Sequence, residues 1–178
     1  MKNKKISSKI KYLFSLVIVI LILGVLYSYF GESKTIVEVV HGNSMFPTIK
    51  DNQSVEVEYG YYQNHQILRG EIVVIDFRTR NEDFVKRVIA IPGDSVLFGK
   101  DSQIYLNDNQ LRENYISNNE SFNKNELITL LTQLEYYNNT IPEGYYLVLG
   151  DNRLDSYDSG SYGLILKERI IGKIAGIT

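Results

Sequence analysis

The sequence predicts a mainly β protein: a β-barrel or β-sandwich core with a small inserted region, preceded by one transmembrane helix. Three observations support this fold class. Short β-branched or alternating segments recur from Lys34 onward, Gly, Asn and Asp separate them, and one long uncharged segment comes before them. The chain has 178 residues, of which 44% are hydrophobic and 22% charged, and this suits one membrane segment and one globular domain.

The uncharged segment comprises residues 12–30. As a helix it would span about 28 Å, close to the hydrocarbon thickness of a bilayer. Five lysines precede it, which predicts that residues 1–11 are cytoplasmic and residues 31–178 extracellular. A cleavable signal peptide is the alternative, but it would have a shorter apolar core and an Ala-x-Ala-like site after it. We expect a single-pass anchor in the cell membrane, with lipid as a partner.

The extracellular part is predicted to consist of short strands and one helix. Leucines and a tyrosine at helical spacing predict an amphipathic helix over residues 125–137. This helix belongs to an Asn-rich stretch, Ser117 to Thr140, within an inserted region of about 99–143. The pattern predicts strands over residues 35–40, 54–59, 71–77, 84–90, 103–106, 145–149 and 169–177, with a hairpin turn at 107–110.

The composition excludes several kinds of chemistry. The chain has no cysteine, which removes thiol catalysis and thiolate metal ligands, and its two histidines leave little for a His-rich metal site. The net charge of -2 does not indicate binding to nucleic acid through bulk positive charge. We expect no metal, no cofactor and no nucleic-acid partner.

A serine follows the first predicted strand, within Gly42-Asn43-Ser44-Met45-Phe46-Pro47-Thr48. It sits at a Gly/Asn break, and Pro47 restrains the backbone after it. A serine in such a turn can be exposed, with its backbone N–H directed at a bound carbonyl. Taken alone, the pattern is more typical of a serine that only hydrogen-bonds to the backbone.

A lysine lies inside an apolar strand, in Phe84-Val85-Lys86-Arg87-Val88. Because side chains alternate along a strand, Lys86 and Arg87 point to opposite faces, so one of the two cations is a candidate for burial. Burial lowers the pKa of an ammonium group and frees the amine to act as a base. The alternative is a lysine that extends from an edge strand to solvent.

A third polar cluster, Gly150 to Ser159, follows the apolar strand Tyr145–Leu149. It reads Gly-Asp-Asn-Arg-Leu-Asp-Ser-Tyr-Asp-Ser. Such a loop is compatible with a turn held by its own side chains, or with a group of residues that orient a catalytic pair. The spacing does not match a calcium-binding EF-hand loop.

Together the three clusters resemble the type I signal peptidases, membrane serine proteases that use a Ser/Lys dyad. The resemblance rests on Ser44-Met45-Phe46-Pro47-Thr48, on Lys86-Arg87-Val88 with Pro92-Gly93-Asp94, and on Gly150 to Ser159, in this order behind an anchor. It implies a membrane-bound serine endopeptidase that removes signal peptides from secreted preproteins, cutting after small residues. The single anchor and the small size are similar to the Gram-positive branch.

The resemblance also implies individual roles. Ser44 would be the nucleophile, its backbone N–H the oxyanion donor, and Lys86 the general base. Ser156 would hydrogen-bond to the Lys86 amine. The other implied residues are the supporting Asp151, Arg153 and Asp158, and the substrate-binding Met45, Ile36, Val37 and Val39.

Two positions depart from the family pattern. Gly160 stands where the family usually has an arginine, which removes a supporting ion pair. Gly42 stands where part of the family has a serine whose hydroxyl donates to the oxyanion. A second class of function, a non-catalytic or dedicated assembly factor for surface polymers or pili, stays open because of Gly160.

Overall fold

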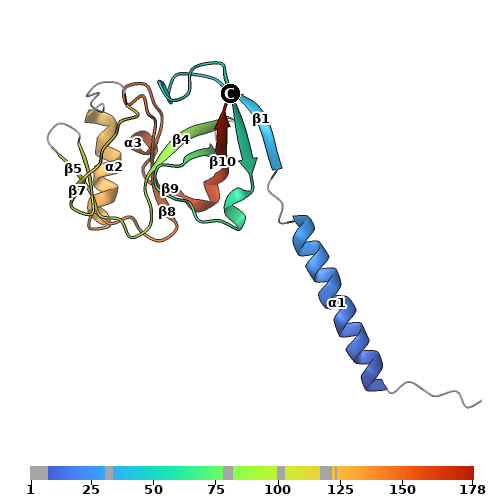
Figure 1. The fold of residues 1–178 in the computed structure, drawn as a ribbon. Helices are drawn as coiled ribbons and strands as arrows, with labels where there is room; N and C mark the ends of the chain where they lie inside the picture. Colours follow the sequence, from blue (N-terminus) through green and yellow to red (C-terminus); the bar gives the residue numbers. More distant parts are fainter. Residues whose placement is uncertain (1–7, 31–33, 78–81, 100–102, 117–121, 123) are drawn as a thin grey trace, which may run out of the picture. The chain divides into compact units, whose positions relative to one another are not determined.

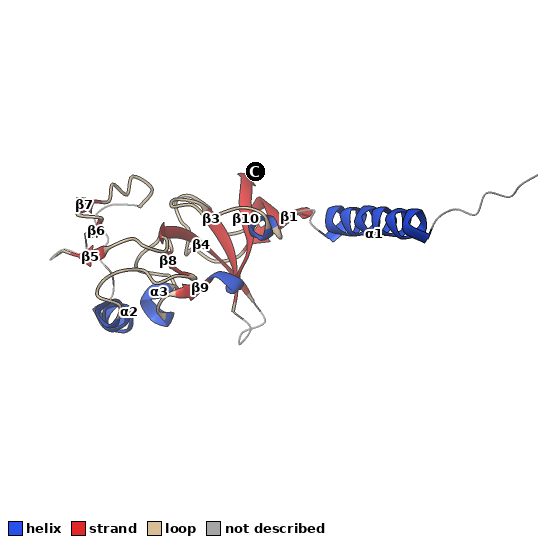
Figure 2. Cartoon of the chain, turned by 90° about the horizontal axis from the view of Figure 1, so that it is seen from below, coloured by secondary structure: helices blue, strands red, loops and turns tan. Residues whose placement is uncertain are grey.

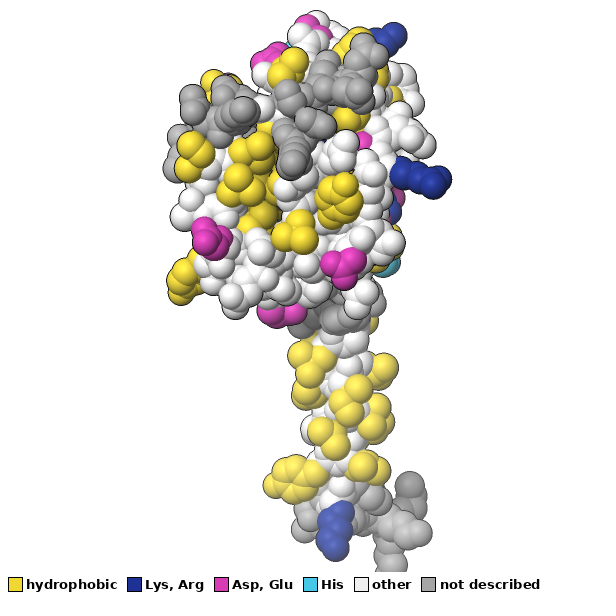
Figure 3. Space-filling view, turned by 90° about the vertical axis from the view of Figure 1, so that its left-hand side faces the viewer, with side chains coloured by type: hydrophobic (Ala, Val, Ile, Leu, Met, Phe, Trp, Pro, Cys, Tyr) yellow, Lys and Arg dark blue, Asp and Glu magenta, His cyan; other side chains and the backbone are white. Residues whose placement is uncertain are grey.

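The computed structural model describes residues 8–30, 34–77, 82–99, 103–116, 122 and 124–178, in two units. The first unit contains helix α1, Ser8–Phe30, which begins four residues before the predicted apolar segment. Its side chains from Tyr12 to Val25 are exposed, and Figure 3 shows apolar groups along the visible side of this helix. No helix in the described part of the chain meets the length and hydropathy of a membrane span.

The second unit is built on a seven-stranded antiparallel sheet (Figure 1). Its order is β1-β2-β10-β3-β4-β8-β9. The sheet is open in the described residues, with β1 and β9 at its edges, so the predicted closure into a barrel is not seen. The strands are β1 Lys34–Val40, β2 Gln53–Tyr59, β3 Ile72–Asp76, β4 Asp83–Ala90, β8 Tyr145–Leu149, β9 Ile165–Leu166 and β10 Ile170–Ile177.

A separate small sheet, which begins at Val96 just before the predicted inserted region of about 99–143, has one helix beside it (Figure 2). Strands β5 (Val96–Phe98), β6 (Ile104–Leu106) and β7 (Asn109–Gln110) make the sheet, and α2 covers Lys124–Tyr136. The hairpin turn is shorter than predicted. Only Asn107 and Asp108 form it, with φ angles of 50° and 65°. A two-residue hairpin turn that matches the twist of its strands requires such positive φ angles at both residues.

Three short helices and three short strands were not predicted. They are η1 (Tyr61–Gln63), α3 (Ser159–Tyr162), η2 (Lys167–Arg169), β5, β7 and β9. Elements of two to four residues are too short to show a periodic pattern. Helix α3 begins where it does because the Asp158 side chain accepts a hydrogen bond from the Gly160 backbone N–H, which caps the helix.

The strand order brings two distant polar segments together. Strand β4 pairs with β8 so that Arg87 lies opposite Leu149, the last residue of β8. The loop that begins at Gly150 therefore starts beside Lys86. Apolar clusters pack around this junction, and the one beneath β2 and β10 contains Met45, Ile49, Val55, Val57, Val74 and Ile174.

Candidate active site

Ser44 lies in the turn between β1 and β2, held from two sides. The Phe46 N–H donates to the Asn43 carbonyl at 3.0 Å, and the Asn152 N–H donates to the Ser44 carbonyl at 3.0 Å. Gly42 precedes it with a φ of 91°, a conformation that L-residues rarely adopt. The turn therefore fixes the Ser44 backbone while its side chain stays half-buried.

Lys86 is buried next to this serine. Its side chain is 1% exposed, and its Nζ lies 2.8 Å from the Ser44 Oγ and 2.8 Å from the Val85 carbonyl oxygen, to which it donates. Burial lowers the pKa of Lys86 to about 8, although the charges of Asp158, Asp151 and Asp155 act in the opposite direction. At pH 7 roughly a tenth of this amine is then neutral, a far larger fraction than for an ordinary lysine.

Arg87 points to the other face of β4 and has the ion pair that Lys86 lacks. Its guanidinium binds both carboxylate oxygens of the buried Asp151, at 2.8 and 2.6 Å. Among the described residues, no carboxylate forms an ion pair with Lys86. Of these two adjacent cationic side chains, only Arg87 therefore has a carboxylate partner among the described residues.

A second lysine, Lys173, does form an ion pair and serves as a comparison for Lys86. Lys173 on β10 lies 2.7 Å from a carboxylate oxygen of Glu71. This hydrogen bond raises the pKa of Lys173, which outweighs its partial burial. Lys173 is therefore a charged structural lysine, whereas Lys86 is poised to lose its proton.

Ser156 does not make the expected contact. Its Oγ is buried and has no hydrogen-bond partner among the described residues, so the predicted bond to Lys86 is absent. The Val85 carbonyl takes that place, because Lys86 reaches its own strand backbone at 2.8 Å. The direction of the Ser156 hydroxyl depends on the path of the loop backbone, and a sequence motif does not define that path.

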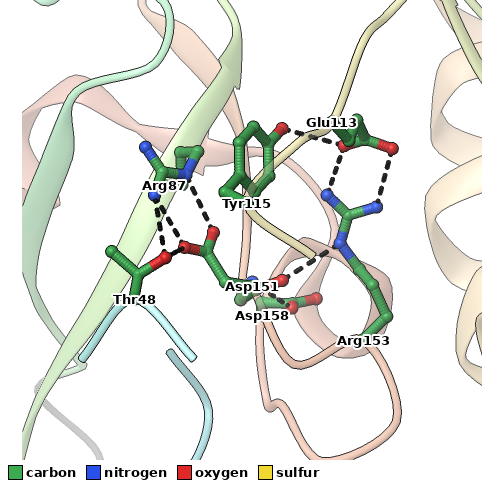
Figure 4. A network of polar contacts seen from close by, with 8 residues as sticks. Thr48, Arg87, Glu113, Tyr115, Asp151, Arg153 and Asp158 are labelled. Atoms are coloured by element: carbon green, nitrogen blue, oxygen red, sulfur yellow. Dashed lines mark hydrogen bonds and ion pairs between the residues drawn. The ribbon is translucent and has the colours of Figure 1, made fainter. Parts of the chain in front are cut away.

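The loop after β8 is held by its charged side chains (Figure 4). Asp151 accepts a hydrogen bond from the Thr48 hydroxyl as well as the two from Arg87, so it connects β4 with the Ser44 turn. Asp158 accepts from the backbone N–H groups of Gly150, at 2.8 Å, and Gly160, at 2.9 Å. The bond from the Gly160 N–H caps α3, and it uses a backbone group that any residue except proline would provide at this position.

Arg153 completes the support of Gly150. Its Nε donates to the Gly150 carbonyl at 3.0 Å, so both polar groups of this residue's backbone are held by side chains. Gly150 also needs its lack of a side chain. A Cβ there would lie 2.5 Å from the Ser44 carbonyl oxygen and 2.3 Å from the Ser156 Oγ. The loop therefore packs against the nucleophile turn through a glycine backbone.

The predicted substrate-binding residues divide into two groups. Strand β1 is an edge strand on which Val37 and Val39 are exposed, at 62% and 49%, while Ile36 is half-buried. Met45, in contrast, is 1% exposed and belongs to the apolar core. Met45 therefore packs beneath the turn, and almost none of its side chain is accessible to a substrate.

A cavity large enough for a ligand lies elsewhere. It has a volume of about 810 Å³ and is lined by parts of β2, η1 and β10, including Tyr59, Tyr62 and Ile170. It contains none of the predicted site residues. Among the described residues, no group of three metal-ligating side chains is present.

Comparisons with known proteins assign the chain to a family. The family model for signal peptidase, peptidase S26, matches residues 9–178. The chain belongs to this family. It is 38% identical to signal peptidase IB of Staphylococcus aureus over 142 residues, which cover 76% of this chain and 73% of the relative. It is 37% identical to signal peptidase I U of Bacillus subtilis over 134 residues, which cover 75% and 70%.

A solved structure, a signal peptidase I from Enterococcus faecalis, is 28% identical, covers 64% of this chain and 97% of that one, and has a TM-score of 0.47. Membership in the family identifies the chain as a peptidase, an activity to which the geometry of Ser44 and Lys86 is suited. The resemblance did not point to the residues of the inserted region that contact the loop, Glu113 and Tyr115.

Proposed function

We propose that the chain is a membrane-bound serine endopeptidase that removes signal peptides from exported preproteins, with Ser44 as nucleophile and Lys86 as general base. The observation that carries this proposal is the 2.8 Å distance between the Ser44 Oγ and the amine of a buried lysine without a carboxylate partner among the described residues. The assembly-factor alternative is not favoured, because the family model and the relatives are peptidases.

The mechanism consists of proton transfers between Lys86, Ser44 and the reacting groups. Neutral Lys86 accepts the Ser44 hydroxyl proton while the Oγ bonds to the scissile carbonyl carbon. The resulting ammonium returns the proton to the leaving amine as the C–N bond breaks, which leaves an acyl-enzyme and a neutral lysine. Lys86 then takes a proton from water while the hydroxide bonds to the acyl carbon. As the bond between that carbon and the Ser44 Oγ breaks, the Lys86 ammonium returns the proton to the Oγ, which restores the serine hydroxyl and the neutral amine.

The oxyanion of each tetrahedral intermediate would be stabilised by the backbone N–H of Ser44. The hydrogen bonds that hold the turn use the amides of Phe46 and Asn152 and leave the Ser44 amide for this role. Gly42 offers no hydroxyl. A single lost oxyanion donor can cost about 3–4 kcal/mol of barrier, so the remaining donor is expected to be essential.

The exposed edge of β1 is the proposed docking site for extended substrate. An edge strand presents unpaired backbone groups that can pair with a peptide, and Ile36, Val37 and Val39 would contact alternate side chains. A charge at this edge, as in Val37→Glu, should raise KM with little change in kcat. An unchanged KM would remove β1 from the substrate site.

Residues 12–30 are the proposed membrane anchor, with residues 1–11 in the cytoplasm and 31–178 outside. The proposal is supported by the uncharged segment, the five lysines before it and the exposed apolar side chains of α1. It places the inserted region, about 99–143, within the extracellular domain. Extraction of the protein from membranes by alkaline carbonate, without detergent, would contradict an anchor.

The function is tested by cleavage of a preprotein with an Ala-x-Ala site by the full-length protein in detergent. Wild type should cut after the second Ala, as mass spectrometry of the products would show, and a chelator should have no effect. Ser44→Ala should lose about 10⁴-fold or more of kcat. Ser54→Ala on β2 and Lys173→Met are matched controls that should retain activity. Equal activity of Ser44→Ala would exclude the assigned nucleophile.

A further inference from the structure

Two side chains of the inserted region contact the loop that follows β8. Glu113 and Tyr115 lie between β7 and α2, outside the three clusters that carry the family resemblance. Figure 4 shows both side chains directed at the two arginines of the site, Arg87 and Arg153. The inserted region thus reaches the catalytic core through specific polar contacts as well as apolar packing.

Glu113 forms a two-pronged ion pair with Arg153. Its carboxylate oxygens accept from both terminal nitrogens of the guanidinium, one of them at 3.2 Å. Both side chains are shielded from solvent, with 1% of Arg153 and 10% of Glu113 exposed. Ion pairs of this geometry in a dry site hold both partners in one arrangement, and loss of one partner leaves a buried charge.

Tyr115 connects the same carboxylate to the second arginine. Its hydroxyl donates to Glu113 at 2.9 Å, and the Arg87 guanidinium lies 4.1 Å from the centre of its ring. Burial raises the pKa of Tyr115, so the hydroxyl keeps its proton and remains a donor. Glu113 and Tyr115 therefore brace both arginines at once.

The two arginines transmit this bracing to the reacting pair. Arg153 holds the Gly150 carbonyl, and Gly150 packs so closely on the Ser44 carbonyl that no Cβ fits between them. Arg87 holds Asp151, whose carboxylate also binds Thr48 in the nucleophile turn. A shift of either arginine would move the turn that carries Ser44.

We propose that Glu113 and Tyr115 are positioning residues, which make peptidase activity depend on the docking of the inserted region onto the loop after β8. This inference rests on the proposed function, because it assigns the residues to the same reaction. On this proposal the inserted region sets the distance between nucleophile and base. A displacement of about 1 Å at a catalytic pair can lower the rate about 100-fold.

The first test compares Glu113→Gln with Glu135→Gln in the full-length protein in detergent. Glu135 is an exposed glutamate on α2, so its variant makes the same chemical change within the inserted region without a contact to the site. Glu113→Gln should lower kcat about 10- to 100-fold with KM unchanged within about twofold. Glu135→Gln should match wild type in both constants.

A pair of tyrosine variants separates the hydroxyl from the ring. Tyr115→Phe keeps the stacking on Arg87 and loses only the bond to Glu113, so its kcat should fall between those of wild type and Tyr115→Ala. Tyr115→Ala loses both and should approach the Glu113→Gln value. Equal kcat for wild type, Glu113→Gln and Tyr115→Ala would overturn the proposal.

Hydrogen exchange tests the bracing without relying on turnover. The backbone amides of Gly150 and Asn152 should exchange faster in Glu113→Gln than in Glu135→Gln, by about tenfold or more, while the amides of β2 and β10 remain unchanged. Equal exchange at Gly150 and Asn152 would overturn the proposal even in a sample that cuts no substrate. Faster exchange in Glu113→Gln, together with a wild type that cuts no substrate, would support the bracing and contradict the proposed function alone.

Discussion

Replacement of Lys86 by methionine is expected to stabilise the fold while it abolishes catalysis. Burial lowers the pKa of Lys86 from 10.5 to about 8. Each pKa unit corresponds to about 1.4 kcal/mol, so keeping this residue protonated at pH 7 costs the folded state about 3 kcal/mol. Methionine has a similar length and no charge. Loss of the hydrogen bonds to Ser44 and Val85 removes about 1 kcal/mol of this stabilisation, so the variant should have a free energy of unfolding about 2 kcal/mol higher than wild type.

The pH dependence distinguishes this effect from ordinary repacking. The folded-state pKa of Lys86 is depressed, so between about pH 8 and the unfolded value the unfolded chain binds more protons. Wild-type stability should therefore rise with pH in this window relative to the variant, by up to about 1.4 kcal/mol per pH unit. Below the window the difference should be constant. The raised pKa values of buried tyrosines contribute equally to both proteins and cancel.

The assay is urea unfolding of the full-length protein in detergent, followed by circular dichroism at pH 7, 8, 9 and 10. Lys173→Met is the matched control. The pKa of Lys173 is raised by its hydrogen bond to Glu71, so the loss of this amine should destabilise the fold at pH 7. A Lys86→Met protein that is less stable than wild type at pH 7, by an amount independent of pH, would show that burial of this amine costs the fold nothing.

Three further substitutions probe the loop and the turn. Gly42→Ser restores the hydroxyl found in part of the family, but the φ of 91° is unfavourable for serine, so it should cost about 1 kcal/mol in urea unfolding without raising kcat. Gly150→Ala places a Cβ 2.5 Å from the Ser44 carbonyl and should lower kcat about 100-fold, whereas Gly24→Ala on α1 should not; equal kcat values would contradict the close packing. Asp158→Asn removes a charge that raises the pKa of Lys86, so the acidic limb of kcat/KM should move to lower pH while kcat falls; a shift to higher pH would contradict the assigned influence.

Features that depend on local pattern could be predicted from the sequence. Strand β8 begins and ends at the predicted residues, because a short apolar run between turn residues has clear limits. The alternation along β4 also indicated that Lys86 and Arg87 face opposite sides and that one cation is a candidate for burial. The choice of Lys86 came from the family resemblance, since alternation treats both faces alike.

Contacts that depend on the path of loops could not be predicted. Glu113 lies 40 positions from Arg153, in a region without a motif, and no periodic signal connects the two. Ser156 lies in a matching motif, yet its hydroxyl has no partner among the described residues. Met45 was expected at the substrate pocket because it follows the nucleophile, but the turn directs it into the core. The open seven-stranded sheet likewise depends on strand pairing, which single segments do not encode.

The role of Lys86 as base is tested most directly by an NMR titration of its amine in protein labelled with ¹³C-lysine, with Lys86→Met to assign the signal. We expect a midpoint at about 8, because burial without an ion pair favours the neutral amine. Lys173 provides an internal reference that should titrate above the ordinary lysine value. A Lys86 midpoint at or above 10.5 would make the neutral amine roughly 300-fold rarer at pH 7 than a midpoint of about 8 does, and it would contradict its role as the base for Ser44.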